Sequence, residues 1–143
     1  MTLTALPEHE CERLLRAGFF GRMVLPTPGR TEVIPVNYAV MGDVVLVRTS
    51  VGSLLDRHAD GAPLLLEVDQ VDHERWAGWS VVVRGRGARV DERDLTPAER
   101  GSPGPPPWVQ GTEVWIRLRW DEISGRQLGN GSLVPPAVRR VWR

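Results

Sequence analysis

Residues 112–123 alternate between apolar and polar side chains, and this pattern strongly limits what the chain can fold into. The apolar members of the alternation are Val114, Ile116, Leu118 and Trp120. Successive side chains of a strand point to opposite faces, so one face enters a core and the other meets solvent or a partner. Five further β-rich runs precede this one, at residues 19–25, 31–40, 43–49, 63–69 and 79–90. The sequence therefore predicts a mainly β domain with six strands.

Turn signals between these runs predict that neighbouring strands are antiparallel. Pro26, Pro28 and Gly29 separate the first two runs, and Gly42 lies in a tight hairpin between the second and third. Short helices fit residues 7–17 and 53–60, and a third begins near Thr96. This order contains no parallel βαβ unit, and six short strands are too few for an ordinary immunoglobulin sandwich. We expect a six-stranded antiparallel split β-barrel with short peripheral helices.

Length and composition predict one domain. The chain has 143 residues, of which 41% are hydrophobic, and this is enough to bury one core. We expect the domain to span residues 1–128, with an exposed loop at residues 101–107 and a C-terminal tail at residues 129–143. The single cysteine permits no intramolecular disulfide, the first residues lack a secretory pattern, and no apolar run is long enough to span a membrane. These features predict a cytoplasmic protein.

The charged residues exclude several functions. All eighteen basic residues are arginines, and eighteen acidic residues balance them. The chain therefore lacks the overall basic field of a nucleic-acid or membrane binder, and it has no lysine for a Schiff base. Its three histidines are far apart and lack metal-ligand spacing, so we expect no metal site. Nothing in the sequence identifies a catalytic residue.

Three groups of residues could hold a ligand. Arg48, Thr49, Ser50 and Ser53 lie where a strand ends and a helix begins, and their hydroxyl, guanidinium and backbone N–H groups suit a phosphate monoester. An ordinary capped helix remains an alternative.

The second group is Pro35, Val36, Asn37 and Tyr38. Its proline indicates either an edge strand or a place where a planar ring lies alongside. The third is Trp79 with Ser80, either a ligand contact or a surface tryptophan.

Taken in order, these segments resemble the pyridoxamine 5'-phosphate oxidase-like family, which has the FMN-binding split barrel. The matching pieces are residues 21–22, 34–38, 47–49, 52–53, 67–69, 78–85 and 123–126. Together they extend over about residues 8–126. One departure is Leu54, which stands where the family usually has a lysine that reaches the phosphate.

The resemblance implies a homodimer with two FMN sites between its subunits. Pro35, Val36, Asn37 and Tyr38 would line the isoalloxazine ring, and Arg48, Thr49, Ser50 and Ser53 would hold the phosphate. Trp79 and Ser80 would approach from a barrel strand, of the same or of the other subunit. The implied chemistry is hydride transfer between the flavin and an unidentified small molecule.

Other functions stay open on the same barrel. The cofactor could be a deazaflavin (F420), whose acidic tail the arginines could meet. A non-enzymatic cofactor- or ligand-binding module is a further alternative, which Leu54 favours. A nucleic-acid-binding barrel is disfavoured by the balanced charge.

Overall fold

The computed structural model describes residues 3–101 and 113–129. The elements follow one another as β1 (Leu3–Ala5), α1 (Glu8–Ala17), β2 (Phe20–Thr27), β3 (Arg30–Met41), β4 (Val44–Ser50), α2 (Leu54–His58), β5 (Pro63–Asp72), β6 (Ala77–Val90), the 3-10 turn η1 (Glu92–Asp94), α3 (Pro97–Arg100) and β7 (Glu113–Leu128). The loop expected at residues 101–107 lies outside the described residues except for its first position, and so does the tail after Gly129. Among the described helices, none is long and apolar enough to cross a membrane.

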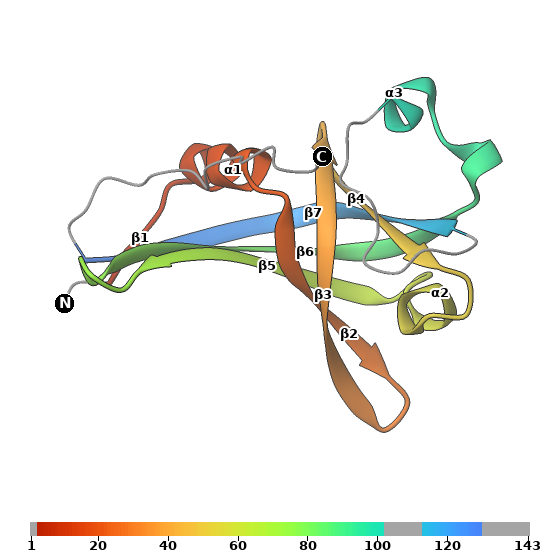
Figure 1. Ribbon diagram of the computed structural model, residues 1–143, viewed down its shortest axis with the longest axis horizontal. Helices are drawn as coiled ribbons and strands as arrows, with labels where there is room; N and C mark the ends of the chain where they lie inside the picture. The colour runs from red at the N-terminus through yellow and green to blue at the C-terminus, as the bar shows by residue number, and fades with distance from the viewer. Residues whose placement is uncertain (1–2, 102–112, 130–143) are drawn as a thin grey trace.

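All strand pairs are antiparallel, and the sheet closes on itself. The strands follow the order β1-β7-β4-β3-β2-β5-β6, and an additional pairing of β6 with β7 joins the two sides (Figure 1). The six strands β2 to β7 thus form a ring, which confirms the predicted barrel. The short β1 was not predicted. It adds to β7 through the pairing of Leu3 with Leu128.

Two seams of the barrel are short. Strands β3 and β4 pair only from Tyr38 to Met41, and β2 and β5 pair at only three positions. Beyond the first seam, β3 remains paired with β2 alone, as a hairpin that extends away from the barrel (Figure 1). The barrel is therefore split beside the first half of β3.

The interior is filled from the inward faces of the strands and closed at one end by α1. Cys11, Leu14 and Leu15 of α1 are fully buried, because they lie on one face of an amphipathic helix. The hydroxyl of Tyr38 donates a hydrogen bond of 2.6 Å to the backbone oxygen of Leu15. This contact joins α1 to β3 inside the core.

A bulge in the long β6–β7 pair bends these strands around the barrel. The register shifts between Arg84 and Gly85. A Cβ atom at Gly85 would overlap the backbone oxygen of Arg119, so only glycine fits where the two strands approach closely.

A second, smaller cluster lies on the outside of the sheet. Leu46, Val90 and Leu95 pack there with Trp115. The segment that carries Leu95 continues into α3, whose start at Thr96 was predicted. Thr96 and Glu99 form a capping box, in which each side chain accepts a hydrogen bond from the other residue's backbone N–H.

Candidate cofactor site at the split between β3 and β4

Pro35 lies on the edge of β3 that faces the split. The backbone N–H of Tyr38 donates to Phe19, so the backbone groups of Tyr38 point towards β2. Backbone direction alternates along a strand, and the groups of Pro35 therefore point away from β2, to an edge that β4 does not cover there. A proline at this position removes no ladder donor. The edge-strand prediction for this residue is correct.

The outer face of the split combines residues of β3 and β4. Tyr38 and Val47 are register partners and both are buried in the core. Their neighbours Asn37 and Arg48 must then lie on the opposite, outer face. Pro35 shares this face and is exposed. The structure thus brings Pro35, Asn37 and Arg48 together.

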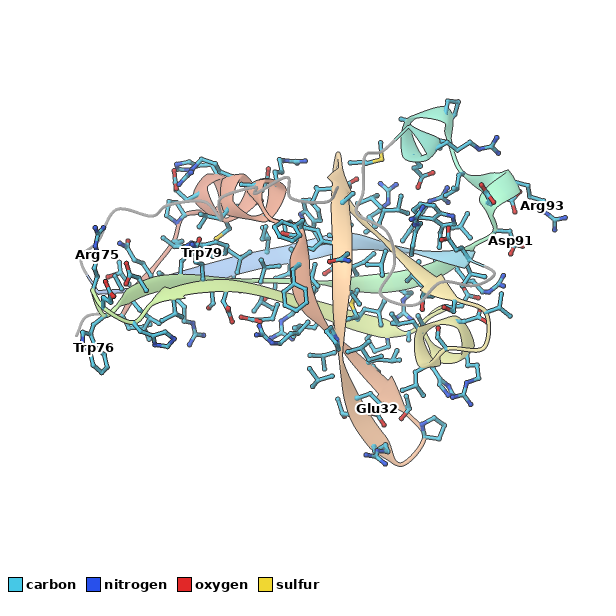
Figure 2. The ribbon with its side chains drawn as sticks, in the orientation of Figure 1. Glu32, Arg75, Trp76, Trp79, Asp91 and Arg93 are labelled. Atoms are coloured by element: carbon cyan, nitrogen blue, oxygen red, sulfur yellow. The ribbon has the colours of Figure 1, made fainter. Side chains whose placement is uncertain are left out.

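Three predicted ring contacts belong to the core instead. Val36, Tyr38 and Trp79 are at most 4% exposed, and Figure 2 shows Trp79 on the α1 side of the sheet. Burial raises the pKa of Tyr38, whose hydroxyl already donates to Leu15. These side chains cannot reach a ligand at the surface, because alternation along β3 and β6 directs them inward. Only their backbone groups remain available to the predicted site.

Arg48 is separated from Thr49 and Ser53, two of the three hydroxyl residues that were expected to act with it. Thr49 follows Arg48 in β4 and faces the other side of the sheet. The guanidinium of Arg48 lies 3.5 Å from Glu113 and stacks on the ring of Trp115, with 5.1 Å to the ring centroid. Ser50 shares the outer face with Arg48. The predicted group of four therefore does not assemble around one point.

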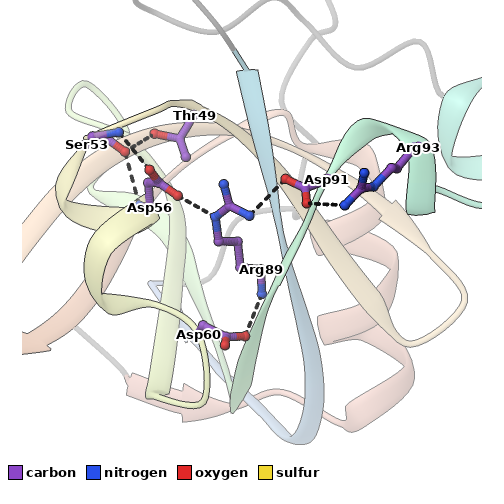
Figure 3. Close-up of polar contacts among 8 residues, drawn as sticks. Thr49, Ser53, Asp56, Asp60, Arg89, Asp91 and Arg93 are labelled. Atoms are coloured by element: carbon purple, nitrogen blue, oxygen red, sulfur yellow. Dashed lines mark hydrogen bonds and ion pairs between the residues drawn. The ribbon is translucent and has the colours of Figure 1, made fainter.

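Thr49 and Ser53 do come together, and their hydroxyl groups are bonded to each other and to the first turn of α2 (Figure 3). Their hydroxyl oxygens are 2.7 Å apart, and Ser53 also accepts from the backbone N–H of Asp56. The backbone N–H of Gly52 donates to Asp56 at 2.7 Å. A phosphate at the start of α2 would need these same donors. The Asp56 carboxylate already occupies the N–H of Gly52, and the two hydroxyl groups are bonded to each other.

Arg89, near the end of β6, holds Asp56 in this position. Its Nε atom donates to Asp56 at 2.5 Å, and its Nη1 atom donates to Asp91 at 2.9 Å. The backbone N–H of Arg89 donates to Asp60, so the residue is tied to α2 and to the loop after it. The hydrogen bond from Arg89 lowers the pKa of Asp56, and the one from Gly52 adds to this effect. Asp56 is therefore a stable anion where a phosphate was expected.

The two halves of the predicted cofactor site thus differ in their fit. The edge of β3 at Pro35 offers backbone and an exposed face to a planar group, and it fits a flavin ring. The start of α2 has donors that are already bonded, and Leu54 brings no cation to it. These residues do not fit a phosphate.

Ser80 lies on the outer face of β6, away from the split. Its register partner is Asp69 of β5, and β2 lies between β5 and β3. Three strand spacings separate β6 from β3, a distance on the order of 14 Å. One subunit therefore does not bring Ser80 to Pro35.

A charged cluster on β2 and β5 lies between these two positions. Nη1 of Arg22 is 3.1 Å from Glu67 and 3.2 Å from Asp69. Partial burial raises the pKa of Glu67 to about 7, and the neighbouring Asp69 adds to the shift. Arg22 is the register partner of both Pro35 and Glu67, which places the cluster beside the split.

The sequence interpretation missed the roles of Asp56 and Arg89. Neither residue was among those that the sequence singled out for the site. The pairing of Asp56 with Arg89 joins residues from two elements with β5 between them, and no local pattern predicts such a contact. Arg22, Glu67 and Asp69 lie within the motifs of the family resemblance, and that resemblance was the one signal that could have indicated them.

A cleft of about 410 Å³ lies elsewhere on the barrel, at the outer ends of β2, β5 and β6. Its lining includes Val24, Pro63, Leu65 and Arg84. It contains none of the residues that the sequence predicted for a cofactor.

Comparison with known proteins establishes the family. The family described as pyridoxamine 5'-phosphate oxidase matches residues 7–127. This chain belongs to the pyridoxamine 5'-phosphate oxidase-like family. The match spans α1 and every strand of the barrel, so family membership and fold agree with the resemblance seen in the sequence.

Similar proteins come from several bacteria. An FAD binding protein of Mycobacterium smegmatis is 33% identical, with a TM-score of 0.70 over 87% of this chain and 97% of that one. A FAD-binding protein of Mesorhizobium loti is 22% identical, with a TM-score of 0.73 over 91% and 99% of the two chains. An uncharacterised protein of Mycobacterium tuberculosis is 34% identical over 92 residues, which are 61% of this chain and 60% of that protein's length.

Proposed function

We propose that this chain binds a flavin, FMN by family resemblance, and uses it as an oxidoreductase acting on a small molecule. The active form is a cytoplasmic homodimer with a cofactor site at each split. The observation that carries this proposal is the uncovered edge of β3 at Pro35, beside the half-buried Asn37 and Arg48. A planar heterocycle can lie along such an edge and use its backbone groups as hydrogen-bond partners.

Each residue of the proposed site has a distinct task. Pro35 presents a rigid apolar surface to the ring, and the Asn37 amide can donate to or accept from the ring heteroatoms. Ser80 approaches the ring from the second subunit, since β2 and β5 separate it from Pro35 within one subunit. The bound flavin supplies hydride transfer, and the protein supplies position and exclusion of water.

The similar proteins support a flavin and offer FAD as a second candidate. Those of Mycobacterium smegmatis and Mesorhizobium loti are described as FAD binding, and the first shares a third of its residues with this chain. An FAD would place its ring on the same edge of β3 and extend its adenosine towards solvent.

The cofactor that copurifies with the protein tests this proposal. We expect the visible absorbance bands of a flavin and the mass of FMN or FAD after denaturation. A deazaflavin spectrum would identify F420 in its place. Failure of apoprotein to take up riboflavin, FMN, FAD or F420 would refute the proposed function.

Replacing Asn37 tests the position of the ring. Asn37→Ala removes one hydrogen-bonding amide from the outer face of β3 and should weaken flavin affinity about tenfold. Thr31→Ala, an exposed change on the same strand, is the matched control and should leave the affinity unchanged. Flavin fluorescence quenching measures both. Equal affinities of the two variants would place the ring elsewhere.

A further inference from the structure

The start of α2 carries hydrogen-bond donors that would suit a phosphate, but these donors are already bonded within the chain. The backbone N–H of Gly52 is bonded to Asp56, and the hydroxyl of Thr49 is bonded to that of Ser53. Ser53 in turn accepts from the backbone N–H of Asp56. A phosphate that used the N–H of Gly52 would have to displace the carboxylate of Asp56.

The charges around this point do not favour an anion. Asp56, Asp60 and Asp91 contribute three negative charges, and Arg89 and Arg93 contribute two positive ones. Both guanidinium groups already face carboxylates of the same cluster. A phosphate dianion bound at the N–H of Gly52 would meet the carboxylate of Asp56 at close range.

Arg48, the other candidate cation, faces away from these donors, and its buried Nε atom has no hydrogen-bond partner among the described residues. It lies on the opposite face of the sheet from Thr49 and is paired with Glu113 and stacked on Trp115. Leu54 holds the position at which the resemblance leads us to expect a lysine. The position at the start of α2 that a lysine would occupy is therefore apolar.

We infer that the flavin site of this chain does not select for the phosphate: riboflavin, FMN and FAD bind through the ring, with affinities within about threefold of one another. This inference rests on the proposed function and narrows it, because it names the part of the ligand that is recognised. Asp56 is the residue that closes the phosphate position, and Arg89 keeps Asp56 there.

The dissociation constants of riboflavin, FMN and FAD test the inference directly. They are measured on the apoprotein at one ionic strength by flavin fluorescence. Values within about threefold support the inference, and an FMN affinity tenfold or more above that of riboflavin would overturn it. If none of the three binds, the proposed function itself fails, a result distinct from selective binding of FMN.

A variant designed to open the site tests the role of Asp56. Leu54→Lys with Asp56→Ala frees the N–H of Gly52 and adds a cation, so FMN should bind at least tenfold more tightly than riboflavin. Leu54→Lys with Asp60→Ala is the matched control, since it removes a carboxylate of the same cluster that does not touch Gly52. We expect no preference for FMN in the control.

Thermal unfolding shows whether each variant is folded. If Asp56→Ala prevents folding, Asp56→Asn combined with Leu54→Lys keeps the shape of the cap and removes its charge, and the FMN preference should again rise. An unchanged ratio of affinities in a folded opened variant would contradict the role of Asp56.

Discussion

At the scale of single residues, alternation along strands decides which predicted contacts are possible. Arg48 and Thr49 are neighbours in sequence, and this proximity led to their prediction as one phosphate site. In a strand they point to opposite faces, so Arg48 stacks on Trp115 while Thr49 contacts Ser53. The same alternation separates Tyr38 in the core from Asn37 on the surface. Sequence motifs identify the right segment. The alternation of side chains along the strand then decides which residues of that segment face outward and can contact a ligand.

The carboxyl group of Glu67 should make stability depend on pH. Its pKa is raised to about 7 by burial and by Asp69, so the folded protein binds more protons than the unfolded chain between about pH 4.5 and 7. Stability therefore falls as the pH rises through this range. Glu67→Gln removes the loss, and because the side chain is partly exposed we expect a gain of about 1 kcal/mol at pH 8.

Thermal unfolding at two pH values checks this expectation. Glu67→Gln should unfold about 3 °C above the unsubstituted protein at pH 8 and at nearly the same temperature at pH 5. Glu122→Gln, an exposed change on β7, serves as control and should match the unsubstituted protein at both. An equal shift at the two pH values would assign the effect of Glu67 to packing.

At the scale of elements, local patterns predicted most strands and helices, and non-local pairing decided the rest. The alternation at Val114 to Trp120 and the hairpin at Gly42 identified β7 and the β3–β4 turn. The three residues of β1 are exposed and too short to show a period, so the sequence held no signal for them. The short pairing between β3 and β4, which opens the split, depends on how the barrel closes and is invisible to local patterns.

An ion pair ties α3 to β7. Glu99 accepts hydrogen bonds from Nε and Nη2 of Arg117 at 2.7 and 2.6 Å, and its side chain is 7% exposed. The hydrogen bond from Arg117 lowers the pKa of Glu99 to about 2. Its contribution is complete above the ordinary carboxyl pKa of about 4.5 and is lost as the pH falls towards 2.

Glu99→Gln should detach α3 without opening the barrel. The change keeps the size of the side chain but removes its charge, and we expect a loss of about 1–2 kcal/mol at pH 7. Amide hydrogen exchange should become faster between Leu95 and Gly101 and stay unchanged in β5 and β6. Glu92→Gln, on the exposed turn η1, is the control. Faster exchange throughout the barrel would show that α3 is part of the same cooperative unit.

At the scale of the whole molecule, the separation of Pro35 from Ser80 leads the proposed function to predict two copies of the chain around one flavin. Both lie on outer faces, with β2 and β5 between them, so a ring in contact with both must lie between subunits. We expect light scattering to give a homodimer at micromolar concentration, with one flavin per subunit. A monomer with flavin bound would contradict the shared site, and it would leave Ser80 without a role.

The place of β7 in the barrel has a consequence for biosynthesis. β7 is the last described strand and pairs with β1, β4 and β6. While the ribosome is still making it, β4 and β6 each lack a neighbour, and the nascent chain presents two strand edges to other molecules. Closure must await pairs as distant in sequence as Leu3 and Leu128, and such non-local pairing is slow. A ribosome stalled before residue 113 should therefore hold a chain that chaperones bind strongly and that aggregates on release.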